Sequence, residues 1–376
     1  MLREDGGVPL LGCAPSRGLA MGVPVRARVV VPLVVLVVLA GVALGLLLSR
    51  WTGGAPTPQP GETPAPDVTP PPGEPLFAPL TGEEVDAPLE RPVLAVKIEN
   101  SPAARPQSGL EAADVVFEQL TEGGITRFVA LFHSRLADPI GPVRSARFVD
   151  ADLLPAYDPL VAISGAAAPV HEALRGAGLT VVEEGQVAGF FRSSERAAPH
   201  NLYLHPQELL DAVEGPPPPR EVVWDHSAEP PAGGTAGDAI VVPMSDQSVT
   251  GWRYDAQAGR YRREQDGAPF TVTGPDRVGA ANVLVLGVET QAIPGQDASG
   301  QPLLGTDVIG SGRAIVLRDG RRYEGTWEKA SPASHFSFSG PDGSPLPLKP
   351  GPSWLLLAPV DRLPPPAEPG AATEMP

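Results

Sequence analysis

The chain almost lacks cysteine: its 376 residues include a single one, Cys13. No intrachain disulfide can form, and everything beyond residue 13 is free of thiols. An exported protein without cysteine avoids misoxidation, but many cytosolic proteins are also cysteine-poor, so the compartment must be inferred from other features. Aromatic residues are scarce too, at 5%, whereas hydrophobic residues make up 42% of the chain and can supply the cores of two domains.

An excess of positive charge is also missing. The formal net charge is -16 at pH 7, so nucleic acid and anionic lipid surfaces are repelled at long range. We therefore expect no nucleic-acid partner. A local basic pocket is still compatible with an acidic protein.

The motifs of the common catalytic classes do not occur. The chain has no Walker loop, GxSxG elbow, HExxH helix or dinucleotide fingerprint. His200 and His205 flank three residues, but no third ligand follows at a metal-binding spacing. We predict neither a metal nor a cofactor.

One long uncharged run lies near the N-terminus. Residues 29–48 carry no charge, and at about 1.5 Å per residue they span the roughly 30 Å hydrocarbon core of a bilayer. Arginine predominates among the charged residues of 1–28, so the positive-inside rule keeps this end in the cytoplasm. The alternative is a cleaved signal peptide, but residues 46–51 offer no small-x-small cleavage site. The run predicts a single-pass anchor in the cytoplasmic membrane, with the domains outside.

Two further features concern the start of the chain. Residues 10–13, LLGC, have the form of a lipoprotein processing box, but no hydrophobic segment of adequate length precedes them, so we interpret the match as chance. Met21 is an alternative start, because residues 21–50 alone form a basic and then apolar export signal.

Proline is abundant, at 48 residues, and much of it occurs in blocks that mark linkers. Residues 49–79 are predicted to be such a linker, either a polyproline-like spacer or plain disorder. A connector is expected at 216–238, with a short strand at 221–224. The tail at 363–376 should be disordered.

Residues 80–215 are predicted to form an α/β domain. A valine-rich run at 92–99 is typical of a buried strand, and two further runs, 114–120 and 126–134, suggest a hairpin or a tight βαβ edge. Helix-like and strand-like segments then alternate, as an α/β layer requires. In order, they are a helix at 145–156, a strand at 160–164, a helix at 169–177, a strand at 180–184 and a helix at 205–213.

Residues 239–362 are predicted to form a β-rich, mostly antiparallel domain. Short strand-like runs are separated by turn signals, among them the hairpin pair Asp319-Gly320. The runs are 239–242, 252–254, 260–263, 281–288 and 313–318.

Several long motifs resemble one bacterial family. KIENSPAARPQSGLEAADVVFEQLTEGGITRF, with IGPVRSAR and APHNLY after it, is similar to the first domain of the YerB-like lipoproteins, and GSGRAIVLRDGRRYEGTWEK with LKPGPSW is similar to their second domain. The resemblance spans roughly residues 80 to 360 and implies a two-domain, envelope-facing protein without an established reaction. This chain differs in having no cysteine at the end of its apolar segment, where a transmembrane helix would replace the lipid anchor.

The segment most suited to a ligand is IGPVRSARFVD, residues 140–150. Gly141-Pro142 makes a turn, and Arg144 and Arg147 follow where a helix is expected to begin. Guanidinium groups beside free backbone N–H groups are suited to holding an anion.

Other polar residues extend this prediction to a set of candidate ligand-binding residues. His200-Asn201 is interpreted as a polar pair that lines a pocket or caps the next helix. Arg192 adds to an unusual number of arginines in an acidic domain. The alternative is that these arginines pair with carboxylates in a buried network that fixes the fold. The predicted ligand-binding residues are Asn100, Arg105, Arg127, Arg144, Ser145, Arg147, His200 and Asn201.

Glu118 and Glu122 are the candidate catalytic residues, with Glu99 nearby if the strands pair. A carboxylate cluster could serve acid/base chemistry, although the same spacing is common on solvent-facing strands and loops. Three functions therefore stay open: a binder of an anionic or carbohydrate-like envelope ligand, a hydrolase with Glu118 or Glu122 as general base, and a scaffold for a protein partner.

Overall fold

The computed structural model describes residues 75–216, 218–219, 221–297 and 300–367. The predicted transmembrane run, the N-terminal segment 1–28 and most of the linker lie outside these ranges, as does most of the tail. Among the described residues, no helix is long and apolar enough to span a bilayer. Strands greatly outnumber helices, in agreement with a strand-rich protein of two domains in sequence.

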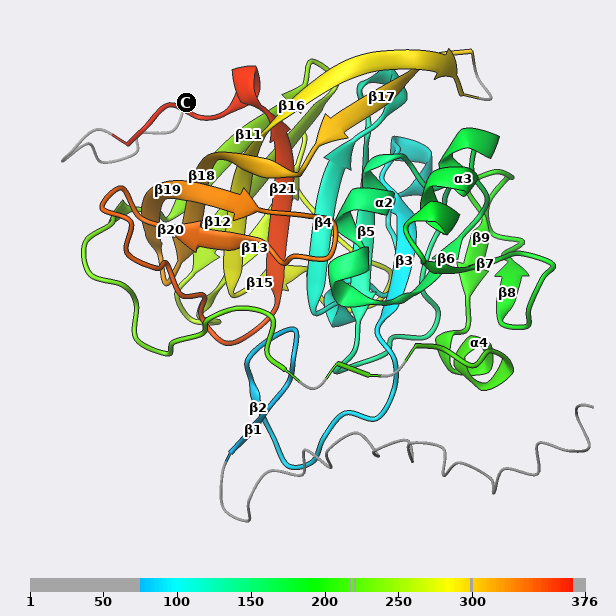
Figure 1. Cartoon of the computed structure of the whole chain (residues 1–376), viewed down its shortest axis with the longest axis horizontal. Coiled ribbons are helices and arrows are strands. Elements are labelled where there is room, and N and C mark those ends of the chain that lie inside the picture. Colours follow the sequence, from blue (N-terminus) through cyan, green and yellow to red (C-terminus); the bar gives the residue numbers. More distant parts are fainter. Residues whose placement is uncertain (1–74, 217, 220, 298–299, 368–376) are drawn as a thin grey trace, which may run out of the picture. The chain divides into compact units, whose positions relative to one another are not determined.

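A twelve-stranded mixed sheet forms the centre of the protein (Figure 1). The first half of the chain supplies β3 Leu94–Glu99, β4 Val115–Leu120, β5 Thr126–Phe132, β6 Leu160–Ile163 and β7 Thr180–Glu183. The second half supplies β10 Thr235–Ala236, β16 Asn282–Gln296, β17 Pro302–Asp307, β18 Gly310–Arg318, β19 Arg321–Lys329, β20 Ser337–Ser339 and β21 Ser353–Pro359. The order is β10-β19-β18-β16-β21-β4-β5-β3-β6-β7, with β17 beside β16 and β20 beside β19.

The two halves of the chain share this sheet because β21 pairs in parallel with both β16 and β4. Trp354 of β21 lies opposite Val116 of β4 on one side and Val283 of β16 on the other. Both β4 and β21 are buried along nearly their whole length, as expected for strands covered on both faces. The last strand of the chain therefore joins the two predicted domains by backbone hydrogen bonds.

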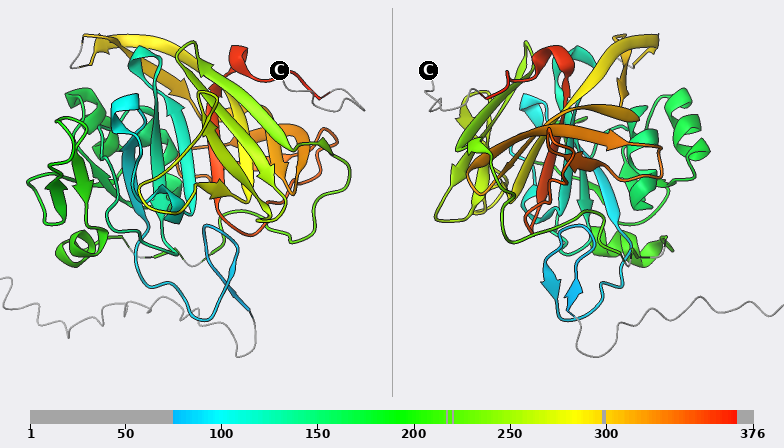
Figure 2. Two further views of the ribbon diagram at one scale, coloured as in Figure 1. Left: turned by 180° about the vertical axis from the view of Figure 1, so that it is seen from behind. Right: turned by 60° about the vertical axis from the view of Figure 1, so that its left-hand side comes forward.

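A second, five-stranded antiparallel sheet covers one face of the central sheet (Figure 2, right). Its strands are β11 Ala239–Ser245, β12 Ser248–Asp255, β13 Arg260–Gln265, β14 Ala268–Pro269 and β15 Gly279–Ala280. Burial alternates residue by residue along β13, which is typical of a strand with one face against a core. Trp252 and Tyr261 from this sheet share a buried cluster with Phe128 and Trp354 from the central one.

Short helices cover the opposite face. Val149 and Leu153 of α2 (Val149–Leu153), with Val170 and Leu174 of α3 (Ala168–Gly176), pack into a second core cluster. The remaining small elements are β1 Leu76–Phe77, β2 Glu84–Val85, β8 Phe190–Arg192, β9 Leu202–Leu204, α4 Pro206–Ala212, η1 Pro102–Ala104, η2 Leu110–Ala112, η3 Glu122–Gly124, η4 Pro155–Tyr157 and η5 Val360–Arg362.

Most of the strands predicted in the first half are present, but the helix predicted at 145–156 is wrong in extent. Only α2 is α-helical there, and Arg144 lies before it in an extended segment. Its backbone N–H donates to Lys97 O at 2.8 Å, and its carbonyl accepts from Ser164 N at 3.1 Å. β6 pairs only with the first three residues of β3, so this segment completes the rest of that edge.

Gly141 makes this path possible. A Cβ at residue 141 would lie 2.7 Å from the Tyr203 ring and 3.0 Å from Leu202 O, and its φ of +155° is one that side chains disfavour. The segment can therefore pass directly against β9. The strand predicted at 221–224 is also wrong: these residues are irregular, and Trp224 anchors them by donating to Phe336 O at 2.9 Å.

Candidate functional site

Two polar networks lie on opposite faces of the central sheet. Successive side chains of a strand point to opposite faces, so Glu118 and Gln119 of β4 enter different networks. The first network faces the five-stranded sheet, and the second faces α2. The two networks differ in their residues and in how far they are exposed to solvent.

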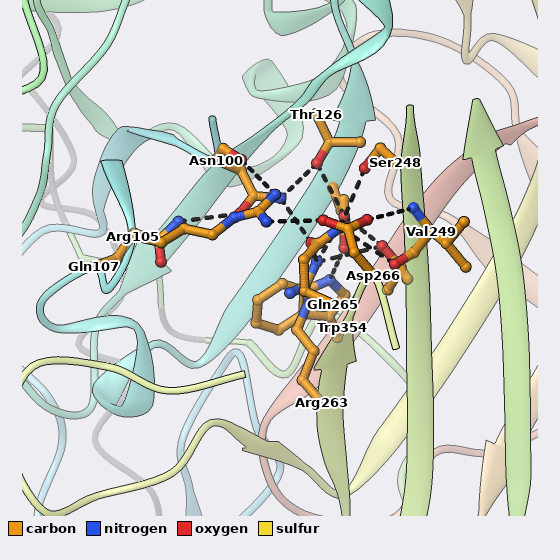
Figure 3. A network of polar contacts seen from close by, with 12 residues as sticks. Asn100, Arg105, Gln107, Thr126, Ser248, Val249, Arg263, Gln265, Asp266 and Trp354 are labelled. Atoms are coloured by element: carbon orange, nitrogen blue, oxygen red, sulfur yellow. Dashed lines mark hydrogen bonds and ion pairs between the residues drawn. The ribbon is translucent and has the colours of Figure 1, made fainter. Parts of the chain in front are cut away.

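The Glu118 network is the first of these (Figure 3). Oε1 of Glu118 accepts hydrogen bonds from Arg263 at 2.8 Å, from the Thr250 hydroxyl at 2.8 Å and from the Thr126 hydroxyl at 3.1 Å. Its Oε2 accepts from the Trp354 indole at 3.0 Å. The network comprises Asn100, Glu118, Thr126, Thr250, Arg263, Gln265 and Trp354.

Arg263 and Glu118 form an ion pair with no exposed side-chain surface on either partner. The guanidinium also lies over three aromatic rings, at 4.2 Å from the Phe270 centroid, 5.1 Å from Phe128 and 5.2 Å from Trp354. Burial lowers the pKa of Arg263, and Glu118 opposes that shift. A carboxylate held by four donors and shut off from solvent joins the two halves of the chain, and this favours a structural role for Glu118.

Asn100 and Arg105, both predicted to bind ligand, belong to this closed face. Asn100 Nδ2 donates to Thr126 at 2.7 Å and to Gln265 at 3.0 Å. Arg105 donates to Asn100 O at 2.8 Å and pairs with Asp266 at 2.9 Å. Figure 3 shows both side chains turned toward residues of the second half of the chain.

The second network, the arginine cluster, lies at the C-terminal ends of β3 and β4. β3 is parallel to β6 and, through β5, runs in the same direction as β4. In open α/β sheets, ligands bind beyond the C-terminal ends of the strands. The cluster comprises Lys97, Glu99, Glu122, Arg127, Arg144, Arg147, Asp150 and His200.

The inner part of the cluster is occupied by ion pairs. Lys97 Nζ contacts both oxygens of Asp150, at 2.7 and 2.8 Å, and the backbone N–H of Arg147 donates to the same carboxylate at 2.7 Å. Burial lowers the pKa of Lys97 to about 8, against the opposing effect of Asp150. Arg147 pairs with Glu122 at 2.6 Å. The sequence predicted that backbone N–H groups at this helix start would hold an external anion. Instead, the Arg147 N–H donates to Asp150, and α2 has only five residues.

Arg127 is the arginine of the cluster without an ion pair to a described acid, although the charges of Glu122 and Glu99 act on it. It lies across the sheet from Glu99 and Gln119 and is 8% exposed. Its Nη1 donates to Ser145 O at 2.9 Å, but Nε has no hydrogen-bond partner and no described acid forms an ion pair with it. Burial, followed by the charges of Arg147 and Arg144, lowers the pKa of Arg127 to about 9. The buried atoms Gln119 Oε1 and Glu122 Oε1 also have no partner among the described residues.

The rim of the cluster faces solvent. Arg144 Nε lies 3.3 Å from Glu99 Oε2, and the Arg144 side chain is 22% exposed. His200 Nδ1 contacts the same carboxylate at 2.9 and 3.0 Å with 28% of its side chain exposed. The hydroxyls of Ser145 and Ser164 lie 3.5 Å apart beside Arg144. In all, four basic side chains and His200 surround three carboxylates.

The structure thus divides the predicted set. It places five of the predicted residues in or beside the arginine cluster, and the other three elsewhere. Asn201 contacts Arg192 at 2.9 Å and Ser193 O at 3.1 Å. The carboxylate cluster expected from Glu99, Glu118 and Glu122 does not form, because Glu118 lies on the opposite face. The five that converge are Arg127, Arg144, Ser145, Arg147 and His200.

Lys97 and Asp150 were missed by sequence reasoning. A lysine inside the apolar run 92–99 was the available signal, since a buried lysine needs a charged partner. The sequence did not say which acid would meet it. Within the described ranges, no group of three or more histidine, cysteine, aspartate or glutamate residues is arranged to hold a metal ion.

The shared mixed sheet and its two networks define a two-domain, strand-rich protein, and comparison with known proteins gives its family. Residues 80–217 match the family model described as "Protein of unknown function (DUF3048) N-terminal domain", and residues 240–355 match the corresponding C-terminal domain. The chain belongs to this family. The resemblance to YerB-like proteins noted in the sequence is confirmed.

A relative and a solved structure agree with this assignment. The chain is 30% identical over 306 residues to "Putative lipoprotein YerB" of Bacillus subtilis (strain 168), covering 78% of this chain and 89% of the relative. It is also similar to the crystal structure of YerB from Bacillus subtilis, with a TM-score of 0.64 and 27% identity over 76% of this chain and 98% of that one.

Proposed function

We propose that this protein is an extracytoplasmic envelope protein that binds an anionic ligand at the rim of the arginine cluster. The observation that carries the proposal is Arg127, a buried guanidinium with an unpartnered Nε and no ion pair to a described acid. Arg144 and His200, at the rim of the cluster, are 22% and 28% exposed. An anion there would supply the missing negative charge, and planar guanidinium groups match the oxygens of phosphate or carboxylate groups.

The ligand class follows from the same chemistry. Phosphate-bearing or acidic glycans combine anionic groups with hydroxyls, and the Ser145–Ser164 pair offers hydroxyl partners next to Arg144. The net charge of -16 keeps such a polymer from binding across the whole surface. Recognition would therefore be confined to this basic site.

The location is part of the proposal. The Bacillus subtilis relative is named a lipoprotein, and here the uncharged run 29–48 would serve as a single-pass helix with the described domains outside. Cys13→Ala should leave the protein in the membrane fraction, whereas deletion of 29–48 should remove it. Loss of attachment in the cysteine variant would show that a lipid, rather than a helix, is the anchor.

Thermal denaturation with and without phosphate tests the binding proposal. A ligand that binds only the native state raises stability by RT ln(1 + [L]/Kd), so a phosphate concentration of 100 Kd adds about 2.7 kcal/mol. Arg144→Ala should abolish the rise while keeping the fold, and sodium chloride at matched ionic strength should not reproduce it. A melting temperature of the wild type that phosphate leaves unchanged would remove the proposal in favour of a scaffold for a protein partner.

A further inference from the structure

We propose that Glu99 positions His200, and that the arginine cluster hydrolyses phosphate esters with His200 as general base. This inference rests on the proposed anion site and adds a reaction to it. It starts from the geometry of one histidine.

His200 is held by a buried carboxylate. Both oxygens of Glu99 lie within 2.9 to 3.0 Å of Nδ1, and the Glu99 side chain is 2% exposed. Ser101 also donates to this carboxylate, at 2.8 Å. With Nδ1–H bound to Glu99, the basic lone pair is on Nε2, for which the described residues supply no hydrogen-bond partner.

His171 and His205, among the described residues, also lie beside carboxylates, and their exposure differs from that of the His200 pair. His171 lies 3.4 Å from Glu183, and His205 lies 2.6 Å from Asp138, but those carboxylate side chains are 20% and 62% exposed. Among these three pairs, only that of His200 combines an enclosed carboxylate with neighbouring arginines. A ring fixed at Nδ1 by a carboxylate that also contacts Arg144 leaves Nε2 to act as a general base.

The position of Glu99 connects the base to the anion site. Its Oε2 lies 3.0 Å from His200 Nδ1 and 3.3 Å from Arg144 Nε, so the imidazole and the guanidinium flank one carboxylate. A phosphate ester bound by Arg144 and Arg127 would therefore lie beside the imidazole. Arg144 and Arg127 would also stabilise the charge that develops on the phosphoryl oxygens.

The reaction balances with water as the only co-reactant. A water molecule gives a proton to Nε2 of His200 as its oxygen bonds to phosphorus. The bond from phosphorus to the leaving oxygen breaks on the side opposite the attacking water, and the leaving oxygen takes a proton from solvent to become an alcohol. The imidazolium returns its proton to solvent. Glu99 acts as a positioning residue, because its role is to hold the ring and stabilise its charged form.

The test is turnover of p-nitrophenyl phosphate and bis(p-nitrophenyl) phosphate by the purified full-length protein. His200→Gln should lower kcat by at least about 100-fold with KM nearly unchanged. Glu99→Gln should also lower kcat while keeping the phosphate-dependent rise in melting temperature. Arg144→Ala should raise KM, and His171→Gln, the matched control, should behave like wild type.

Each result separates this inference from the binding proposal. A wild type that is stabilised by phosphate but turns over neither ester overturns the reaction and leaves the binding site intact. Equal losses in His171→Gln and His200→Gln also overturn it, because the activity would then not depend on the cluster. If His200→Gln unfolds, Glu99→Gln and the wild-type turnover still decide.

Discussion

Buried charge is paired differently on the two faces of β4. On one face, Glu118 meets Arg263, two hydroxyls and an indole, and neither charged partner has exposed side-chain surface. On the other face, Arg127 is nearly as buried but has no ion pair to a described acid. In the Glu118 network, Arg263 pairs with Glu118, and its guanidinium, two of whose nitrogens have no hydrogen-bond partner among the described residues, lies over three aromatic rings. In the arginine cluster, Arg127 has neither an ion pair to a described acid nor a described partner for its Nε.

The largest expected difference concerns stability. Glu118→Gln should lower the free energy of unfolding by roughly 3–5 kcal/mol, because the Arg263 charge would stay buried without its partner. Urea denaturation measures the loss. The matched change in the arginine cluster, Glu122→Gln, should cost less and should strengthen the phosphate response, since it removes a competing carboxylate. A Glu118→Gln loss below about 1 kcal/mol, or one that phosphate restores, would show that the two faces do not differ in this way.

A second, smaller effect is the pH dependence of stability that Lys97 contributes on the arginine-cluster face. Burial lowers the pKa of Lys97 in the folded state to about 8, from its ordinary value of 10.5, so the folded state binds fewer protons between these values. The free energy of unfolding should therefore rise with pH from about 8 to 10, by an amount on the order of 2–3 kcal/mol from this residue.

The measurement compares wild type with Lys97→Met by urea denaturation at several pH values. The variant should lose this contribution to the rise. Lys329, whose pKa is also lowered to about 8, is unchanged in both proteins and cancels in the difference. Parallel pH curves for the two proteins would show that Lys97 does not carry the buried charge assigned to it.

The smallest effect is expected at Arg192. This arginine pairs with Glu184 at the surface, and the two side chains are 42% and 37% exposed. Exposed pairs contribute little, so Arg192→Ala should change stability by less than about 1 kcal/mol. Its phosphate response should equal that of wild type in the same melting experiment. An abolished response would place the anion site near Asn201 rather than at the cluster.

Local pattern was enough to predict most of the first-half strands. The runs at 92–99 and 160–164 are apolar and bounded by turn residues, and each became a strand. The helix at 145–156 was overestimated because tertiary pairing prevailed: the open end of the β3 edge takes Arg144 into extended structure. The parallel pairing of β21 with β4 joins residues more than 200 positions apart, and no local signal reports it.

The candidate site was predicted only in part, because the sequence shows residue spacing but not strand pairing. Arg144 and Arg147 stood out by their spacing, and Arg127 as one of an unusual number of arginines in an acidic domain. Face assignment was beyond the sequence, because strand pairing decides that Glu118 and Glu122 point to different networks. Because the faces were unknown, Asn100 and Arg105 were grouped with the arginines of the cluster. They bond instead to Gln265 and Asp266 at the end of β13.

We propose that buried charge pairs within the protein on the Glu118 face of the central sheet, and that the arginine cluster on the other face binds an anion. Crystals of the wild type soaked in selenate, with anomalous difference density, test that claim most directly. Density should lie within hydrogen-bond reach of Arg144 and Arg127 and should disappear in Arg144→Ala crystals grown under the same conditions. Selenate bound only elsewhere on the protein, or bound equally in the variant, would contradict the account.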